Sequence, residues 1–261
     1  MKVILIILAL ILALGLTACS PATGDDSTEL VVFAAASLSD VMEEIAELYS
    51  DVAPDVQLIF NFASSGTLET QIREGAVADV FISASQYEMD NLEPAFVLDG
   101  TRIDLLENKV ALVVASENPA GIHSFADMAE ALSDGTMLMA MGNRGVPAGR
   151  YAQNVLTHFG LDADELSGRG LISYGANVRE VAAQVREGSV DCGVVYIADA
   201  LEMNLTVVDV ATVAMSGRVI YPAAVINVGE NPDAARAFLE VLASSEAMAI
   251  FESRGFLPPT A

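Results

Sequence analysis

The chain has 261 residues, 53% of them hydrophobic, and carries 12 basic against 36 acidic side chains, a formal net charge of −24. A chain this acidic is a poor partner for nucleic acid and for anionic lipid headgroups, because both repel it. Its length is too great for one small core and suits two lobes of roughly 100 residues each.

The amino terminus predicts export. Met1 and Lys2 precede an apolar run over residues 3–16, which is too short to cross a bilayer core of about 30 Å. Residues 1–18 are therefore predicted to be a signal peptide. The sequence Leu-Thr-Ala before Cys19 resembles the lipobox of bacterial lipoproteins, which implies that Cys19 becomes a lipidated first residue. Residues 19–28 have the composition of a flexible tether, and an ordinary signal peptide with an incidental cysteine is the alternative.

Cleavage would make the mature chain slightly more acidic. Removing residues 1–18 deletes Lys2 and no acid, so 12 − 1 = 11 basic side chains face 36 acidic ones, a formal charge of −25. Cys192 is then the only thiol outside the lipidation site, so no intramolecular disulfide can form, and its apolar neighbours predict that it is buried.

From residue 29 onward, short apolar segments rich in β-branched residues alternate with helical patterns, which is typical of βαβ units. Strands are expected at residues 30–34, 56–60, 79–82, 111–115, 138–141, 193–196 and 224–228. Helices are expected at residues 39–50, 67–74, 124–132, 148–159, 178–187 and 232–244. This alternation predicts an α/β protein with two lobes.

Several of these helices begin where an anion could bind. The residues at their starts are Ser37, Ser64 and Ser65, Pro147 and Ala148, and Asn177 and Val178. The first amides of a helix lack intrahelical partners, and its dipole favours negative charge there, so several helix starts facing one cleft can hold an anion without a cation. Each of these residues also suits ordinary capping, and Tyr196 suits an ordinary buried aromatic. Taken alone, they predict an exported two-lobed binding protein and leave its ligand open.

A family resemblance narrows the ligand. Five strings stand in order: VFAAASLSDVM, FNFASSGTLETQIREGAVADVFISAS, VPAGRYA, NVREVAAQVREGSVDCGVVYIADA and YPAAVI. Together they resemble the periplasmic molybdate-binding proteins of ABC importers, over essentially all of residues 30–257. The resemblance implies the type II periplasmic binding fold, in which two α/β lobes joined by two crossing segments enclose an oxyanion. We expect the first lobe to hold residues 29–108 and 223–261, and the second residues 109–222.

The resemblance also implies a site made only of neutral hydrogen-bond donors. These are the hydroxyls and amides of Ser37 and Ser65, the amides of Ala148 and Val178, and the phenol of Tyr196. A tetrahedral dianion without protons can only accept hydrogen bonds, so such a donor set suits it. Molybdenum would be present only as molybdate, with no direct protein ligand and no cofactor, and tungstate would fit equally.

The resemblance further implies a monomer that works with an ABC permease and its ATPase. The lipid anchor would hold it at the membrane, facing the periplasm or the cell exterior. One departure from the family concerns Arg144, which stands where an Asp-Pro or Asn-Pro pair is common before VPAG. Arg144 either lines the cleft entrance or is a solvated loop residue, and the second reading is favoured.

Other functions fit the sequence less well. An enzyme would need a base for a nucleophilic serine, and His123 and His158 are the only histidines. The sequence has no Gly-x-Ser-x-Gly string and no metal-ligand spacing, so we expect no catalysis. A sensing module that docks to a membrane receptor stays open. A receptor for another tetrahedral oxyanion such as sulfate is the main rival, whereas protonated phosphate would need an acceptor that the predicted site lacks.

Overall fold

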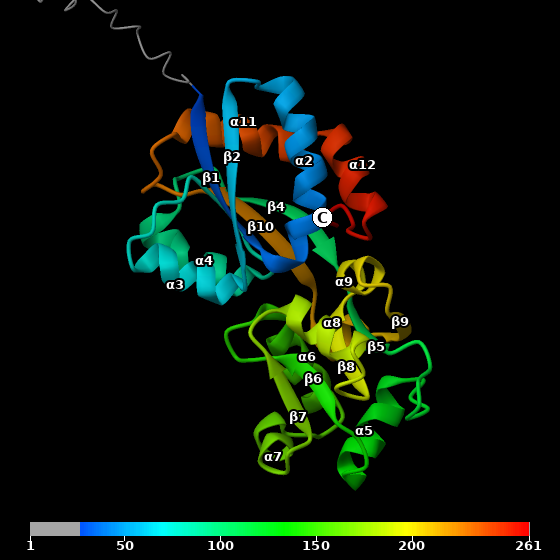
Figure 1. Cartoon of the computed structure of the whole chain (residues 1–261). Coiled ribbons are helices and arrows are strands. Elements are labelled where there is room, and N and C mark those ends of the chain that lie inside the picture. Colours follow the sequence, from blue (N-terminus) through cyan, green and yellow to red (C-terminus); the bar gives the residue numbers. More distant parts are fainter. Residues whose placement is uncertain (1–26, 261) are drawn as a thin grey trace, which may run out of the picture.

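The computed structural model describes residues 27–260. The predicted signal peptide, Cys19 and most of the predicted tether lie outside these residues, so export and lipidation stay predictions. Within the described part, no helix is both long and apolar enough to span a membrane. The described residues form two lobes, each built on one five-stranded sheet (Figure 1).

Lobe I surrounds a sheet with the strand order β2-β1-β3-β10-β4. Its strands are β1 (Thr28–Ala35), β2 (Val56–Ala63), β3 (Val80–Ile82), β4 (Ile103–Asn108) and β10 (Val219–Val225). Its helices are the 3-10 turn η1 (Ala36–Leu38), α2 (Ser39–Val52), α3 (Ser65–Arg73), α4 (Gln86–Phe96), α11 (Pro232–Leu242) and α12 (Ser245–Ser253). Strand β1 runs parallel to β2 and β3, whereas β10 runs antiparallel to β3 and β4.

Helices cover both faces of this sheet, which explains its apolar strands. Alternate residues of β1 point to opposite faces: Val32 belongs to the core that also holds α2 and α11, and Phe33 belongs to a second cluster under α3 and α4. Every residue of β3 and β10 is buried. Strands buried on both faces appear in sequence as continuous apolar runs, and this is why β3 could be predicted from composition.

Lobe II repeats the same plan with the strand order β7-β6-β8-β5-β9. Its strands are β5 (Val110–Val114), β6 (Met139–Gly142), β7 (Ile172–Gly175), β8 (Cys192–Tyr196) and β9 (Thr206–Val210). Its helices are α5 (Phe125–Asp134), α6 (Pro147–His158), α7 (Ala163–Gly168), α8 (Val178–Arg186), α9 (Ile197–Glu202) and α10 (Val213–Ser216). Strand β6 is parallel to β7 and β8, and β5 is antiparallel to β8 and β9. Cys192 is fully buried with a free thiol, as predicted.

Two short crossings join the lobes. Lys109 alone separates β4 from β5, and Gly217 and Arg218 separate α10 from β10. The sequence places the return of the chain to lobe I at residue 223 and predicts a strand over 224–228. The structure differs: β10 starts at Val219 and pairs with β4 from that residue onward, so residues 219–222 lie in the lobe I sheet. Pro222 hides this strand in the sequence, and a bulge between Tyr221 and Pro222 accommodates the missing amide hydrogen.

The carboxyl ends of the parallel strands in both lobes lead into the same region between the lobes. In lobe I, β1 leads into Ser37 and β2 into Ser65, while in lobe II β6 leads into Ala148 and β8 ends at Tyr196. Ligands of open α/β sheets bind beyond these strand ends. The fold therefore puts the candidate site between the lobes.

Candidate functional site

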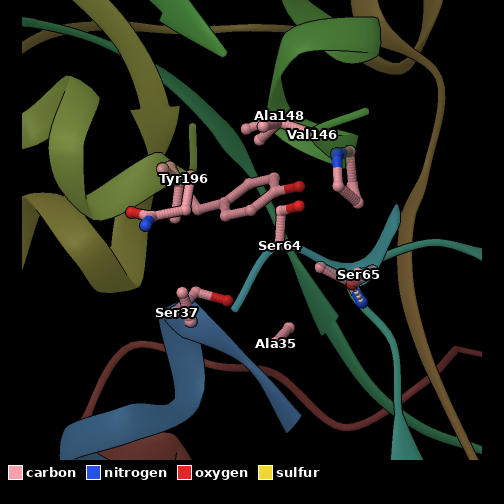
Figure 2. Close-up of a pocket in the computed structure, with 12 residues that line it drawn as sticks. Ala35, Ser37, Ser64, Ser65, Val146, Ala148 and Tyr196 are labelled. Carbon is pink, nitrogen blue, oxygen red and sulfur yellow. Dashed lines mark hydrogen bonds between the residues drawn. The ribbon is translucent and has the colours of Figure 1, made fainter. Parts of the chain in front are cut away.

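One small cavity between the lobes collects the residues that the sequence singled out. Its lining is Ala35, Ala36, Ser37, Ser64, Ser65, Ala84, Val146, Pro147, Ala148, Asn177, Val178 and Tyr196. All five predicted ligand residues are among them, and Figure 2 shows several of these side chains arranged around one space. That they contact an anion stays a prediction.

Ser65 is prepared to donate into the cavity. It is the first residue of α3 and is 1% exposed. Its Oγ accepts a hydrogen bond from the backbone amide of Ala84 at 2.9 Å. Because that bond uses a lone pair of the oxygen, the hydroxyl proton stays available for an acceptor in the cavity.

Ser64 has a different role from its neighbour. Its Oγ accepts from the amide of Thr67 at 3.2 Å and lies 2.8 Å from the hydroxyl of the same residue, so Ser64 is the N-cap of α3. The sequence leaves both serines as helix-start candidates. The structure separates them into a capping residue and a residue whose donor is free.

Ser37 lies in the 3-10 turn between β1 and α2, and its partner was not predicted. Its Oγ is 2.9 Å from the phenolic oxygen of Tyr221, a fully buried residue of β10. The string YPAAVI contains this tyrosine, but nothing local to it indicates contact with Ser37, 184 residues earlier. Only the pairing of β10 into the lobe I sheet brings them together.

Lobe II supplies backbone amides at two helix starts. Pro147 occupies the first position of α6, where its missing N–H costs nothing, and the next amide belongs to Ala148. Asn177 caps α8 by accepting from the amide of Glu180 at 3.0 Å, as predicted, and Val178 follows it. Among the described residues, the amides of Ala148 and Val178 have no hydrogen-bond acceptor. Both are free to bind an anion.

Tyr196 presents a donor that lacks any partner. Its side chain is 1% exposed, and its hydroxyl makes no hydrogen bond to any residue the structure describes. The ring packs edge-on against Tyr221 and Tyr151, with centroids 5.9 and 6.2 Å away. Burial, reinforced by the neighbouring tyrosines and Asp199, raises the pKa of Tyr196 well above its ordinary value, so the phenol keeps its proton. A buried orphan donor costs about 1–3 kcal/mol, and an acceptor in the cavity would relieve that cost.

The cavity itself carries no formal charge. Within the described chain, its lining contains no acidic or basic side chain, only hydroxyls, one amide side chain, free backbone amides and apolar groups. These groups offer more free donors than free acceptors. Chemically, such a cavity suits a small ligand that accepts on all sides.

Charged pairs connect the lobes around this neutral cavity. Arg150 of α6 reaches lobe I, where its Nη2 donates to Glu88 Oε2 at 2.6 Å and to Ser85 Oγ at 2.9 Å. Arg179 of α8 pairs with Asp40 of α2 at 2.8 Å. Both arginines lie in the first turns of helices whose amides line the cavity. These pairs bridge the two lobes on either side of the cavity.

A buried acid lies behind the site. Asp199 of α9 is 2% exposed, and its carboxylate accepts no hydrogen bond from a described residue. Burial raises the pKa of Asp199 to about 7, with Asp40 adding to the rise and Arg179 opposing it.

Arg144 takes the solvated position that the sequence favours. Its side chain is 75% exposed, pairs with Asp164, and is absent from the cavity lining. Neither His123 nor His158 lines the cavity, and in the described part of the chain no cluster of histidine, cysteine and acidic side chains could hold a metal ion.

Two α/β lobes closing on a small cavity of hydrogen-bond donors define a solute-binding protein. Residues 30–257 match the family described as bacterial extracellular solute-binding proteins, and the chain belongs to that family. Membership makes it a binding protein and not an enzyme, as the sequence predicted.

Its relatives share nearly the whole chain. It is 33% identical to the putative ABC transporter substrate-binding lipoprotein YvgL of Bacillus subtilis, over 91% of this chain and 89% of the relative. It is 34% identical to the molybdate-binding protein ModA of Escherichia coli, over 88% of this chain and 90% of the relative. The solved substrate binding domain of a putative molybdenum ABC transporter from Clostridium difficile is 34% identical, with a TM-score of 0.66, covering 90% of this chain and 100% of that one. The type II periplasmic binding fold that the resemblance implied is confirmed.

Proposed function

We propose that this chain captures molybdate or tungstate between its two lobes, using neutral hydrogen-bond donors only, as the binding component of an ABC importer. The observation that carries the proposal is the buried hydroxyl of Tyr196, which has no partner among the described residues and belongs to an uncharged cavity. Donors from Ser37, Ser65, Ala148 and Val178 line the same cavity. A tetrahedral dianion would satisfy all of them at once.

Relatives support the choice of ligand. The Escherichia coli relative is named as a molybdate-binding protein, and it aligns with 88% of this chain. The free donors also favour an oxyanion without protons, because a protonated anion such as hydrogen phosphate would leave its own O–H without an acceptor. Sulfate has the same hydrogen-bonding character as molybdate, so it stays the rival, and cavity size must distinguish them.

Capture would proceed by lobe closure. Ser37 and Ser65 belong to lobe I, and Ala148, Val178 and Tyr196 belong to lobe II, so an anion touching both sets stabilises the closed form. A membrane permease would recognise that form, and a cytoplasmic ATPase would power release. We propose that lipid on Cys19 holds the protein at the outer surface of the membrane.

Calorimetric titration of the mature soluble chain, residues 20–261, tests the ligand. Molybdate and tungstate should bind one-to-one and far more tightly than sulfate or phosphate. If sulfate alone gave binding heat, sulfate would replace molybdate as the assigned ligand. The absence of heat from all four anions would refute the oxyanion proposal.

A separate experiment tests anchoring. The full-length chain should partition with membranes after expression, and Cys19→Ser should release it into the soluble exported fraction. A Cys192→Ser variant is the matched control, because that cysteine is buried in β8 and should not affect partitioning.

A further inference from the structure

The hydroxyl of Ser37 can act as a donor only if its neighbour leaves its proton free. The 2.9 Å contact between Ser37 Oγ and Tyr221 Oη allows either oxygen to donate. If Ser37 donates to Tyr221, its lone pairs face the cavity and repel an anion. If Tyr221 donates to Ser37, the serine proton is available to the ligand.

Asn108 is placed to influence this direction. It is the last residue of β4, and its Oδ1 accepts from the amide of Lys109 at 2.8 Å, which settles which end of the side chain is oxygen and which is nitrogen. The Nδ2 group is buried and makes no hydrogen bond within the described residues. The pairing of β4 with β10 places Asn108 and Tyr221 as diagonal neighbours on the same face of the sheet, so this free donor lies beside the tyrosine side chain. Because an amide nitrogen can only donate, it favours a lone pair of Tyr221 on its side and the Tyr221 proton on the side of Ser37.

The surroundings of Tyr221 leave its proton no other acceptor. The nearby carboxylate of Asp199 accepts no hydrogen bond from a described residue. Burial, and then the charge of Asp199, raise the pKa of Tyr221 well above its ordinary value, so the phenol stays protonated. The ring is held edge-on between Tyr196 and Phe256, with centroids 5.9 and 5.5 Å away, and cannot easily reorient.

We propose that Asn108 and Tyr221 are positioning residues that orient the Ser37 hydroxyl as a donor, so that the lobe I half of the site accepts only fully deprotonated oxyanions. In this arrangement Tyr221 donates to Ser37 and Ser37 donates into the cavity, while the Nδ2 donor of Asn108 disfavours the reverse direction. This inference rests on the proposed function. It also ties the site to the hinge, because β4 and β10 are the lobe I strands that continue into the two crossings, and Asn108 pairs with Val219 between them.

Tyr221→Phe is the direct test. It keeps the packed ring and removes the oxygen, so Ser37 loses its aligning partner. Calorimetric titration should give an affinity for molybdate about 10-fold lower than that of the wild-type chain, the effect of weakening one hydrogen bond to a charged ligand. Tyr49→Phe is the matched control, since Tyr49 is equally buried in lobe I and packs on Phe238 instead. It should leave the affinity unchanged.

A double-mutant cycle separates orientation from loss of structure. In a Ser37→Ala background, Tyr221→Phe should cause little further loss, because the hydroxyl that it orients is already gone. If the double variant lost affinity by the product of the two single losses, the inference would be overturned. A Tyr221→Phe variant with wild-type affinity would overturn it too. A wild-type chain that binds neither molybdate nor tungstate would overturn the proposed function as well, which distinguishes the two failures.

Asn108 offers a change of selectivity that general destabilisation would not produce. Asn108→Asp replaces the donor with a group that accepts, so Tyr221 should turn its proton toward it and Ser37 should present a lone pair to the cavity. The ratio of molybdate to hydrogen phosphate affinity should then fall about 10-fold or more, whereas Asn108→Leu, which only removes the donor, should lower it less. An unchanged ratio in both variants would contradict the inference.

Discussion

The two lobes share one sheet plan but contribute to the site by different chemistry. Lobe I offers side-chain hydroxyls, and each already has a neighbour: Ser65 accepts from Ala84, and Ser37 contacts Tyr221. Lobe II offers the amides of two helix starts and the phenol of Tyr196, and these donors have no partner in the described chain. Lobe I is therefore preorganised, whereas lobe II still lacks the acceptor that an anion would provide.

This difference has consequences for how the site can be altered. Side-chain replacement removes a donor from lobe I but cannot remove a backbone amide from lobe II. In the empty site, the free-energy cost of unsatisfied donors falls on lobe II. Ligand binding should therefore stabilise lobe II more than lobe I.

The largest effect should come from blocking the contact between the lobes. A Cβ atom added to Gly66 of α3 would lie 2.3 Å from the backbone oxygen of Gly145 in lobe II, and neither backbone can yield without moving the lobes apart. Gly66→Ala should cost about 3 kcal/mol of the closed form, or roughly 150-fold in molybdate affinity by calorimetry. Gly168→Ala is the control, because no atom lies within 4 Å of its added Cβ. Equal affinities in the two variants would contradict the closed arrangement.

Removing a preorganised hydroxyl should have the next largest effect. Ser65→Ala should weaken binding roughly 10- to 150-fold, as expected for a lost hydrogen bond to a charged group of about 1.5–3 kcal/mol. Ser64→Ala removes the cap of α3 and should lower the free energy of unfolding by about 1 kcal/mol with a much smaller loss of affinity. Titration and thermal unfolding of both variants measure the contrast. A larger affinity loss in Ser64→Ala would reverse the roles assigned to the two serines.

Removing the orphan hydroxyl of lobe II should separate stability from binding. Tyr196→Phe deletes a buried donor that has no partner among the described residues, so the ligand-free protein should unfold at the same temperature or higher. Its molybdate affinity should nevertheless fall about 10-fold, because the anion loses that donor. A clear loss of ligand-free stability would mean that the hydroxyl is satisfied in the empty protein.

The smallest effect concerns pH and the buried acid of lobe II. The pKa of Asp199 is about 7 in the folded chain against 3.8 as the ordinary value, so the native state holds an extra proton between these limits. The free energy of unfolding contributed by this group should fall as pH rises from about 4 to about 7 and then level off. The groups that act on this acid and its surroundings are Arg179, Asp40, Tyr196 and Tyr221.

Asp199→Asn removes this titration and tests its sign. Relative to the wild-type chain, its Tm should rise with pH, reaching a gain of about 2–4 °C at pH 8 for about 1 kcal/mol. Near pH 4 the two proteins should differ least. A gain that shrinks as pH rises would show that the carboxylate is stabilised when charged.

Sequence patterns predicted the long elements better than the short ones. The expected helix over 39–50 corresponds to α2, and the strand over 56–60 to β2, because each has a strong apolar period. Strands β4, β7 and β9 and helices α4, α7, α9 and α10 were not predicted. The partly exposed residues of β9 and the internal Pro94 of α4 obscure any local pattern, and only pairing or packing with neighbours establishes them.

For the site, residues next to helix starts were predictable and their partners were not. Ser65, Ala148 and Val178 follow from strand-to-helix junctions together with the family resemblance, and all three line the cavity. Tyr221, Asn108 and the Arg150–Glu88 pair come from segments distant in sequence. No local spacing contains that information, because contacts across a sheet or between lobes are set by the register of the whole fold.

The sequence by itself determined the α/β class, the buried strands, the helix starts with their free amides, and the acidic character of the chain. These properties follow from local periodicity, capping chemistry and composition, which act over a few residues. Only the tertiary structure decided that the helix starts of both lobes face one uncharged cavity, that Tyr196 has no partner in the described chain, and that Tyr221 lies beside Ser37. Those facts depend on strand order and on how two chain crossings place one sheet against the other, and that geometry arises from contacts between residues far apart in the chain.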